Sequence, residues 1–250
     1  LRDAVMPNLK IIGSHTFYCC SMLHQLTFEN SLQRFGSYTF YATGLLSADF
    51  KNLDDYITKN NRAQYAFQYS SLLRCSLNTI SRIVKGFFDS CNFLQEVHAP
   101  AITSLGTYAF VDCFYLNEFD MLNVTEIDKG AFCESYIDTL YAPRFTTFKT
   151  GSGLSGLGMN CYSRVINFPA IISLPDYAFS EIFAEEVYLE KTETMESSSF
   201  YAVPNLNILY MPSVKAFSFP KSNSVGPMEL IWVPNAKSTP TIPMQMNDTK

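Results

Sequence analysis

Apolar and polar positions along this chain recur in short units of about 22 residues. Each unit contains a stretch with the pattern apolar-x-x-apolar-x-apolar, seen clearly at 94–100 and 206–212. The stretch alternates over its last residues and ends in a proline, which has no N–H to donate to a sheet ladder. The pattern predicts one short β-strand per unit.

A phenylalanine marks the same position in almost every unit, about six residues before the strand. The series is Phe17, Phe40, Phe67, Phe88, Phe110, Phe132, Phe179, Phe200 and Phe217, with Leu157 in place of a phenylalanine in the one double interval. An apolar residue precedes this position by five: Ile12, Phe35, Ile83, Leu105, Ile127, Leu174 and Met195. Side chains repeated in this way stack in register, so the phenylalanines are expected to form a buried spine.

A single unit is too small to bury its own apolar row, and neighbouring units must therefore stack. Eleven strand candidates at the inter-strand spacing of roughly 4.8 Å would form a rod roughly 50 Å long. We predict a solenoid with a curved parallel sheet of about 10–11 short strands on one side. Irregular or short helical segments are expected to return the chain across the other side.

The repeated phrase resembles the BspA-type leucine-rich repeat, and residues 102–116 (ITSLGTYAFVDCFYL) carry it best. The resemblance covers about residues 1–236 as one solenoid domain. The chain departs from the repeat pattern at three places: an insertion near 51–62, a lost phenylalanine near 151–158 and a shortened unit at 212–217. Residues 237–250 are expected to be a C-terminal tail or the start of a truncated terminal module. The family implies a secreted or cell-surface protein of anaerobic bacteria or parasitic protists that acts in adhesion.

Composition excludes some kinds of partner. The 250 residues carry a net charge of −5, which disfavours nucleic acid because phosphate binding needs clustered Lys and Arg. The sequence contains no run of eighteen apolar residues, so it predicts no membrane span. Residue 1 already lies in the strand position of a unit, so we expect the chain to be a fragment or processed form without its leader or anchor. Its expected location is extracellular or at the cell surface.

Seven cysteines are present: Cys19, Cys20, Cys75, Cys91, Cys113, Cys133 and Cys161. Cys20, Cys91 and Cys113 share one position, three residues after the phenylalanine, where a small side chain can pack against its copy one unit away. We expect buried free thiols, with one or more disulfides as the alternative.

Some motifs could indicate a bound cofactor, a metal or an attached glycan, but ordinary positions in the repeat explain them better. The sequence 151–156 (GSGLSG) matches the dinucleotide-binding pattern, but it falls where the repeat places a return segment and not between a strand and a helix. His15, Cys19, Cys20 and His24 are rich in zinc ligands, but the repeat turns them in different directions. The acceptor motifs at Asn123 and Asn247 are close to chance. No cofactor and no metal are expected.

Alternation along each strand predicts which side chains cover the sheet face. The predicted outward pairs are Gln25/Thr27, Ser47/Asp49, Arg74/Ser76, Glu96/His98, Glu118/Asp120, Thr139/Tyr141, Val165/Asn167, Glu186/Tyr188, Ile208/Tyr210 and Leu230/Trp232. The first half is polar, and the second half carries a row of aromatic residues. Glu96, His98, Glu118 and Asp120 form an acidic group that could act in acid–base chemistry or bind a cation, or could be a solvated or protein-binding patch.

The predicted function is that of a non-enzymatic binding or adhesion module that recognises a protein through the sheet face. Large exposed aromatic side chains suit a contact surface, and the candidate binding residues are Tyr141, Tyr188, Ile208, Tyr210, Leu230 and Trp232, together with Glu96, His98, Glu118 and Asp120. Two alternatives stay open: a glycan-binding accessory protein, because aromatic rings also stack on sugars, and a structural surface spacer without a ligand.

Overall fold

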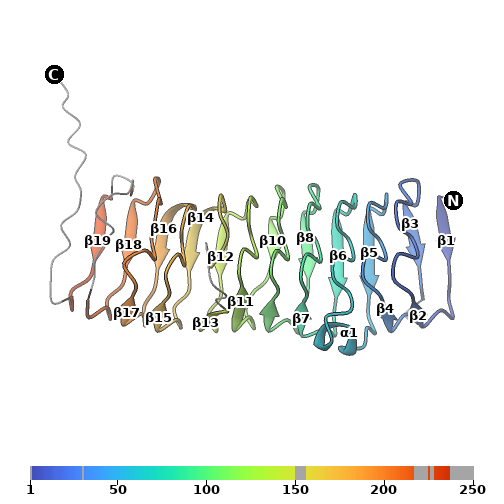
Figure 1. Ribbon diagram of the computed structural model, residues 1–250, viewed down its shortest axis with the longest axis horizontal. Coiled ribbons are helices and arrows are strands. Elements are labelled where there is room, and N and C mark those ends of the chain that lie inside the picture. The colour runs from blue at the N-terminus through green and yellow to red at the C-terminus, as the bar shows by residue number, and fades with distance from the viewer. Residues whose placement is uncertain (1, 30, 150–155, 217–224, 226–227, 237–250) are drawn as a thin grey trace, which may run out of the picture.

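The computed structural model describes residues 2–29, 31–149, 156–216, 225 and 228–236. The chain winds into coils that lie side by side in one long row, with the N-terminus at one end (Figure 1). This architecture confirms the predicted parallel-strand solenoid. Phe217, the rest of the shortened unit after 216, and the tail 237–250 lie outside the described residues.

One row of strands forms the main face of the solenoid, and every pairing in it is parallel. It contains the eleven strands expected from the sequence: β1 (Asp3–Val5), β3 (Gln25–Thr27), β5 (Ser47–Phe50), β6 (Arg74–Leu77), β8 (Glu96–His98), β10 (Glu118–Phe119), β12 (Thr139–Tyr141), β14 (Tyr162–Asn167), β16 (Phe183–Tyr188), β18 (Ile208–Tyr210) and β19 (Leu230–Trp232). They divide into a β1–β3 pair, a four-stranded sheet from β5 to β10 and a five-stranded sheet from β12 to β19.

The return segments are more regular than the sequence indicated, because they form a second row of two- and three-residue strands. These are β2 (Ile11–Ile12), β4 (Arg34–Phe35), β7 (Arg82–Ile83), β9 (Ser104–Leu105), β11 (Glu126–Asp128), β13 (Thr147–Lys149), β15 (Ser173–Leu174) and β17 (Thr194–Met195). Their inward residues are the apolar side chains five positions before each phenylalanine. The helix α1 (Tyr56–Lys59), the one helix in the described part of the chain, lies in the predicted insertion and separates β4 from β7.

The phenylalanine spine is present and buried. Adjacent rings stack with centroids 4.8 Å apart for Phe40 and Phe67, 5.4 Å for Phe88 and Phe110, and 5.5 Å for Phe110 and Phe132. Leu157 is fully buried, and its carbonyl accepts from the Phe132 N–H. It therefore takes the predicted place of the missing phenylalanine, and the spine continues through all the described coils.

At the spine phenylalanines from Phe17 to Phe132 and at Phe179, the residues two positions before and two positions after the ring both have backbone in the left-handed region. At Phe200 only the later one, Ala202, does. Around Phe67, for example, Tyr65 has φ 55° and Tyr69 has φ 60°, and the pair around Phe110 is Tyr108 at 57° and Asp112 at 55°. For a residue with a Cβ this conformation costs about 1–2 kcal/mol. The coils must therefore supply a compensating interaction at each turn.

Hydrogen bonds between neighbouring coils supply this compensating interaction. The N–H groups of Tyr65, Phe67 and Tyr69 donate to the carbonyls of Lys85, Phe87 and Asp89 in the next coil, at 2.9–3.0 Å. The same three bonds recur at Tyr108, Phe110 and Asp112. Because the sign of φ changes along the turn, all three N–H groups face the following coil, and each bond adds about 0.5–1.5 kcal/mol.

Glycine replaces the flanking residue where a neighbouring tyrosine needs the space. Gly86 has φ 60°, and a Cβ there would meet the Tyr65 ring at 2.2 Å. At Gly130, with φ 65°, a Cβ would meet the Tyr108 ring at 2.6 Å. The repeated phrases Lys-Gly-x-Phe in the sequence therefore mark coils on which a tyrosine from the preceding coil lies directly on the backbone.

The position three residues after the spine holds a thiol or hydroxyl that bonds to a carbonyl one coil earlier. The Cys91 Sγ–H donates to the Phe67 carbonyl at 3.0 Å, and the Cys113 Sγ–H to that of Phe88 at 3.3 Å. The Ser135 hydroxyl makes the same bond to Phe110 at 2.6 Å. Burial raises the pKa of the Cys91 thiol to about 12. These cysteines are thus structural donors, as serine can be in the same place.

The main row of strands is interrupted between β10 and β12, which belong to different sheets. Phe119 occupies the inward position that Val97 holds one coil earlier. It is only partly buried, with its ring 4.8 Å from that of Phe110. A phenylalanine is larger than the Val, Leu, Ile, Ala or Cys found at this position in the other strands. This large side chain coincides with the short β10 and the missing ladder.

Candidate functional site

Within each sheet of the main row, the parallel register aligns the outward side chains into two columns. In the five-stranded sheet one column is Tyr141, Asn167, Tyr188, Tyr210 and Trp232, and the other is Thr139, Val165, Glu186, Ile208 and Leu230. In the four-stranded sheet the columns hold Ser47, Arg74, Glu96 and Glu118, and Asp49, Ser76 and His98. The predicted outward pairs are confirmed, except that Asp120 lies just beyond the end of β10.

The second half of the face, here called the aromatic face, consists of Tyr141, Tyr188, Ile208, Tyr210, Leu230 and Trp232. Tyr141 is 45% exposed, Leu230 48% and Trp232 50%, whereas the three residues between them are half-buried. The Tyr188 and Tyr210 rings lie 6.1 Å apart and are tilted by 45°. These side chains therefore form an apolar strip that Asn167 interrupts between Tyr141 and Tyr188 and that is most open at its two ends.

One carboxylate orients the centre of the aromatic face. The Tyr188 hydroxyl donates to Glu186 Oε2 at 2.8 Å, and this hydrogen bond raises the pKa of the tyrosine, with burial as the second cause. Asn167, the one non-aromatic residue in the tyrosine column, has a buried side-chain oxygen without a hydrogen-bond partner. The strip thus combines an oriented Tyr188 hydroxyl with a break in the aromatic column at Asn167.

A second group of aromatic residues on the same sheet was not found from the sequence. The Tyr162 and Phe183 rings stack face to face at 4.4 Å with an interplanar angle of 3°. Tyr136 is exposed and forms an isolated bridge with Tyr162. β14 and β16 begin earlier than the repeat predicts, which brings these rings into the sheet. The aromatic residues at 162 and 183 were the one feature of the sequence that could have indicated the longer strands.

Charges border the aromatic face at its junction with the first half. The Arg164 guanidinium holds the Asp138 carboxylate by two bonds of 3.1 Å, and this pairing lowers the pKa of Asp138. Both side chains are about half exposed, so solvent screens the pair and its contribution to stability is small. The pair spans the two coils that follow the interrupted ladder, where it helps to hold β12 against β14.

The acidic group predicted around His98 is only partly assembled. Glu96 and Glu118 are neighbours in the register, but Glu96 is paired with Arg74, whose Nε lies 3.2 Å from its carboxylate. Asp120 accepts a hydrogen bond from the Leu122 N–H in a turn. Among the described residues no carboxylate pairs with His98, and no group of three or more His, Cys, Asp or Glu side chains could hold a metal ion.

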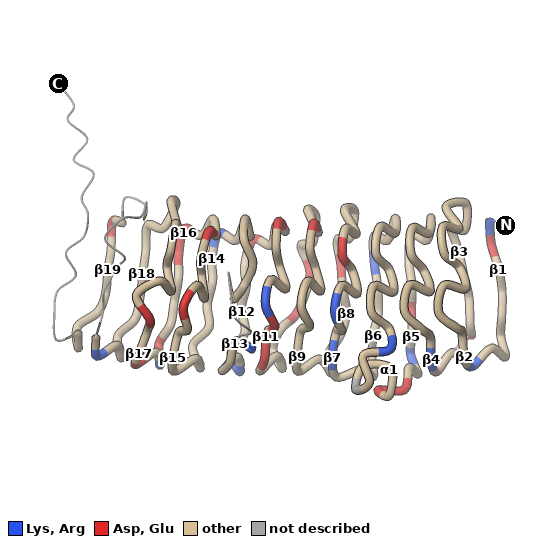
Figure 2. The backbone as a smooth tube through the Cα atoms, viewed as in Figure 1, with Lys and Arg blue, Asp and Glu red and all other residues tan. Residues whose placement is uncertain are grey.

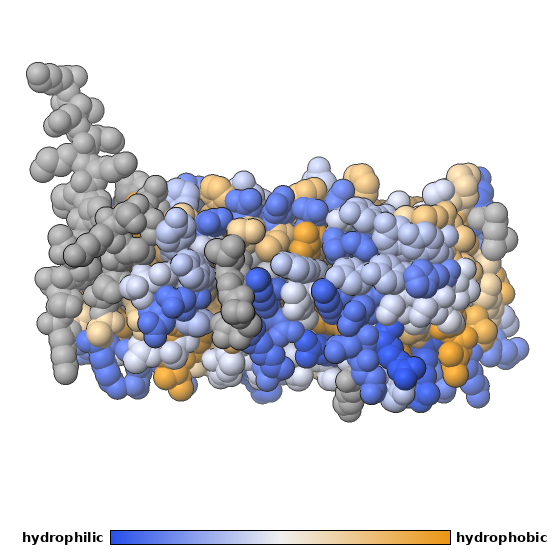
Figure 3. All heavy atoms as spheres, viewed as in Figure 1, coloured by the Kyte–Doolittle hydropathy of each residue, from blue (hydrophilic) through white to orange (hydrophobic). Residues whose placement is uncertain are grey.

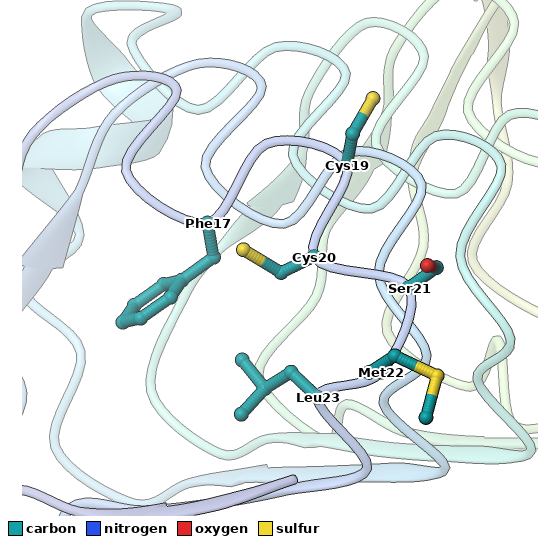
Figure 4. Close-up of a pocket in the computed structure, with 6 residues that line it drawn as sticks. All are labelled: Phe17, Cys19, Cys20, Ser21, Met22 and Leu23. Atoms are coloured by element: carbon teal, nitrogen blue, oxygen red, sulfur yellow. The ribbon is translucent and has the colours of Figure 1, made fainter. Parts of the chain in front are cut away.

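The remaining motifs have structural roles where they are described. Figure 4 shows the Cys20 thiol turned toward Phe17 and Leu23 and that of Cys19 turned away, so the His/Cys group does not converge. Gly156 is buried in a coil ladder, where its N–H donates to Tyr177, and 151–155 lie outside the described residues. The Asn123 side chain donates to the Pro100 carbonyl at 3.0 Å and accepts from Arg144 at 3.1 Å. Asn247 is not among the described residues.

No helix within the described ranges has the length and apolar character needed to cross a membrane. A search of curated proteins found no match. The solved structures that align with the chain include a leucine-rich cell surface protein from Faecalibacterium prausnitzii (15% identity, 88% of this chain and 67% of that one, TM-score 0.43), a leucine-rich-repeat protein from Eubacterium ventriosum (15%, 87% and 68%, 0.41) and one from Bacteroides ovatus (18%, 71% and 50%, 0.42).

The family comparison is more extensive. The model of the BspA type leucine-rich repeat region, built from six copies of the repeat, matches residues 10–139 and 140–224. Those residues include the spine, both rows of strands from β3 to β18 and all the flanking turns. The chain therefore belongs to the BspA-type leucine-rich-repeat family.

Proposed function

We propose that this chain is a non-enzymatic, cell-surface or secreted adhesion module that binds a protein through the aromatic face. The observation that carries the proposal is the column in which Tyr141, Asn167, Tyr188, Tyr210 and Trp232 follow one another in register. Most apolar side chains of the repeats are turned into the core. This strip keeps its apolar side chains outward, where they contribute nothing to the core.

The chemistry of the strip suits a protein partner. Tyrosine and tryptophan provide large contact areas with little loss of side-chain entropy, and they dominate the energetics of protein interfaces. Rigid strands hold them at fixed spacing, so little ordering is needed on binding.

The test uses the intact chain and a panel of purified host matrix proteins immobilised on a sensor surface. We expect at least one of them to bind, and we expect the Tyr210→Ser, Trp232→Ser double variant to lose at least about 2 kcal/mol of binding free energy. Thermal unfolding should show that the variant retains its fold, because both residues project from the sheet.

Tyr115→Ser provides the matched control, since Tyr115 is 56% exposed but lies outside the aromatic face. A second control, Glu96→Gln with Glu118→Gln, tests the acidic first half of the sheet. Unchanged binding in the Tyr210, Trp232 variant would refute the aromatic face as the contact surface. Loss of binding in the acidic variant instead would place the contact in the first half.

A further inference from the structure

A cluster of aromatic side chains covers the turns of the first three coils, on a different side of the solenoid from the aromatic face. We call it the tyrosine edge: His15, Tyr18, Tyr38, Tyr41, Tyr65 and Tyr69. Stacked rings connect it from coil to coil, with Tyr18 and Tyr41 at 4.5 Å, His15 and Tyr38 at 5.1 Å, and Tyr38 and Tyr65 at 5.2 Å. Its members immediately flank the buried spine.

The tyrosine edge has an unusual electrostatic character in a chain with 41 Asp, Glu, Lys and Arg residues, the sum of 23 acidic and 18 basic ones. No such residue occurs in 11–28, 35–48 or 63–73, the segments that contribute these coils. The tube around β3, β5 and β6 is accordingly mostly tan in Figure 2. The same end of the molecule shows a broad pale region of intermediate hydropathy in Figure 3.

The backbone holds the tyrosine edge rigidly. His15, Tyr38, Tyr65 and Tyr69 all have φ between 55° and 60°, and their N–H groups are fixed to the next coil. Rings that are already stacked lose little further freedom when a ligand binds. Burial and the neighbouring Tyr18 raise the pKa of Tyr41, so this hydroxyl stays protonated at neutral pH and can both donate and accept.

Two rings project most from the tyrosine edge. Tyr18 is 45% exposed and Tyr69 is 54% exposed. Tyr69 lies at 79° to Tyr41, so no parallel ring among the described residues covers its face. One open ring face and a row of hydroxyls occur together along successive coils, in segments that carry no charged residue of their own. One charge approaches from the next coil, where the Lys85 ammonium lies 5.7 Å from the Tyr65 ring centroid.

We propose that the tyrosine edge binds a neutral polysaccharide. A sugar presents C–H groups that pack on an aromatic face and hydroxyls that pair with tyrosine, serine and threonine hydroxyls. A typical protein surface is about a quarter to a third charged residues, and those charges would lose hydration against this surface without gaining a partner. A neutral glycan carries no such charge, and a linear chain of sugars can follow successive coils.

The test measures retardation of the intact chain in native gels containing a neutral β-glucan, a mannan or a galactan, with hyaluronan and heparin as charged probes. We expect at least one neutral polysaccharide to bind, with an affinity that does not change between about 50 mM and 500 mM NaCl. Tyr18→Ser combined with Tyr69→Ser should weaken binding at least about tenfold. Tyr69→Glu, which leaves the Tyr18–Tyr41 stack intact, should weaken it as well.

Tyr115→Ser again serves as the matched control and should bind as the wild type does. The Tyr210→Ser, Trp232→Ser variant should also retain polysaccharide binding, so failure of the proposed protein contact leaves this test unaffected. Three results would overturn the proposal: no retardation by any neutral probe, binding to the charged probes alone, or equal binding by the double variant at positions 18 and 69. Binding of a purified protein, but not of a glycan, that depends on Tyr69 would also overturn it.

Discussion

The two sheets of the main face are built on the same coil but present opposite chemistry. The four-stranded sheet from β5 to β10 turns Asp49, Arg74, Glu96 and Glu118 outward. The five-stranded sheet from β12 to β19 presents the aromatic face instead. Beneath both lies the same spine with the same left-handed flanks.

This difference shows that the core and the surface of a coil vary independently. Val97 and Val187 occupy equivalent buried positions, yet their outward neighbours are Glu96 and His98 in one strand and Glu186 and Tyr188 in the other. Stability depends on the inward residue and recognition on the outward one. A substitution should therefore affect one property or the other, according to its place in the alternation.

Removing a spine ring should have the largest effect on stability, and the effect should be similar beneath both sheets of the main face. Phe110→Ala deletes a fully buried ring that contacts Phe88 and Phe132, so we expect a loss of about 3–5 kcal/mol in the free energy of unfolding. Urea unfolding measures it. Phe114→Ala, at a residue 45% exposed in the same coil, should change the value by no more than about 0.5 kcal/mol. Similar losses in both variants would contradict the spine.

The boundary between the halves should be visible in amide hydrogen exchange. The Glu118 N–H donates to the Gln95 carbonyl at 3.0 Å, whereas the corresponding amide of Thr139 has no such bond across the interrupted ladder. We expect the Thr139 amide to exchange at least about tenfold faster than that of Glu118. Equal protection factors would mean that β10 and β12 pair in solution.

A smaller effect is expected where the aromatic column is broken. Asn167→Val removes a buried oxygen that has no partner, so the free energy of unfolding should rise by up to about 1 kcal/mol. Asn123→Val is the matched control, because that side chain both donates and accepts. It should destabilise the protein by about 1 kcal/mol. A loss of stability in the Asn167 variant would show that its oxygen is hydrated.

The smallest effects should appear in the pH dependence of the two halves, and with opposite sign. Burial raises the pKa of Asp89 above 3.8, so its ionisation weakens the fold as the pH rises through the folded pKa. The Arg164 pair lowers the pKa of Asp138 below 3.8, so its contribution is present above 3.8 and lost as the pH falls through the folded pKa.

Thermal unfolding of two variants tests these signs. At pH 7 Asp89→Asn should be more stable than the wild type, and Asp138→Asn should be less stable. Both differences should shrink toward zero as the pH falls below the folded pKa of the residue concerned. Shifts of the same sign at pH 7 would show that one of the two carboxylates has a different environment in solution.

The sequence predicted what depends on period and alternation. The eleven strands, the spine and the outward pairs follow from regular spacing, and Leu157 could be placed because its neighbours fixed the register. The tyrosine edge could not be predicted from the sequence, because the phrase Tyr-Ala-Phe does not reveal that its tyrosine has a positive φ and stacks on a tyrosine of the neighbouring coil. The interruption between β10 and β12 coincides with the large side chain of Phe119, and an apolar pattern is insensitive to side-chain volume.

Within the candidate site, the sequence identified the aromatic column but not its surroundings. Tyr162 and Phe183 entered the sheet because β14 and β16 extend to six residues each, and a fixed repeat cannot express such a difference in length. The pairing of Glu96 with Arg74 needed the register between two strands far apart in the sequence. Local pattern therefore defined each strand, and contacts between coils defined the site.

The hydrogen bonds of the turns have a direction, because from Phe17 to Phe132 and at Phe179 the N–H groups that flank the spine residue donate to the coil that follows. Each of these junctions between coils consequently presents the same donors on one side and the same carbonyls on the other. A coil could be duplicated or deleted at such a junction and the new neighbours would still match. The length of this protein can therefore change by whole coils, and the reach of its two proposed binding surfaces with it, without any change in how neighbouring coils pack.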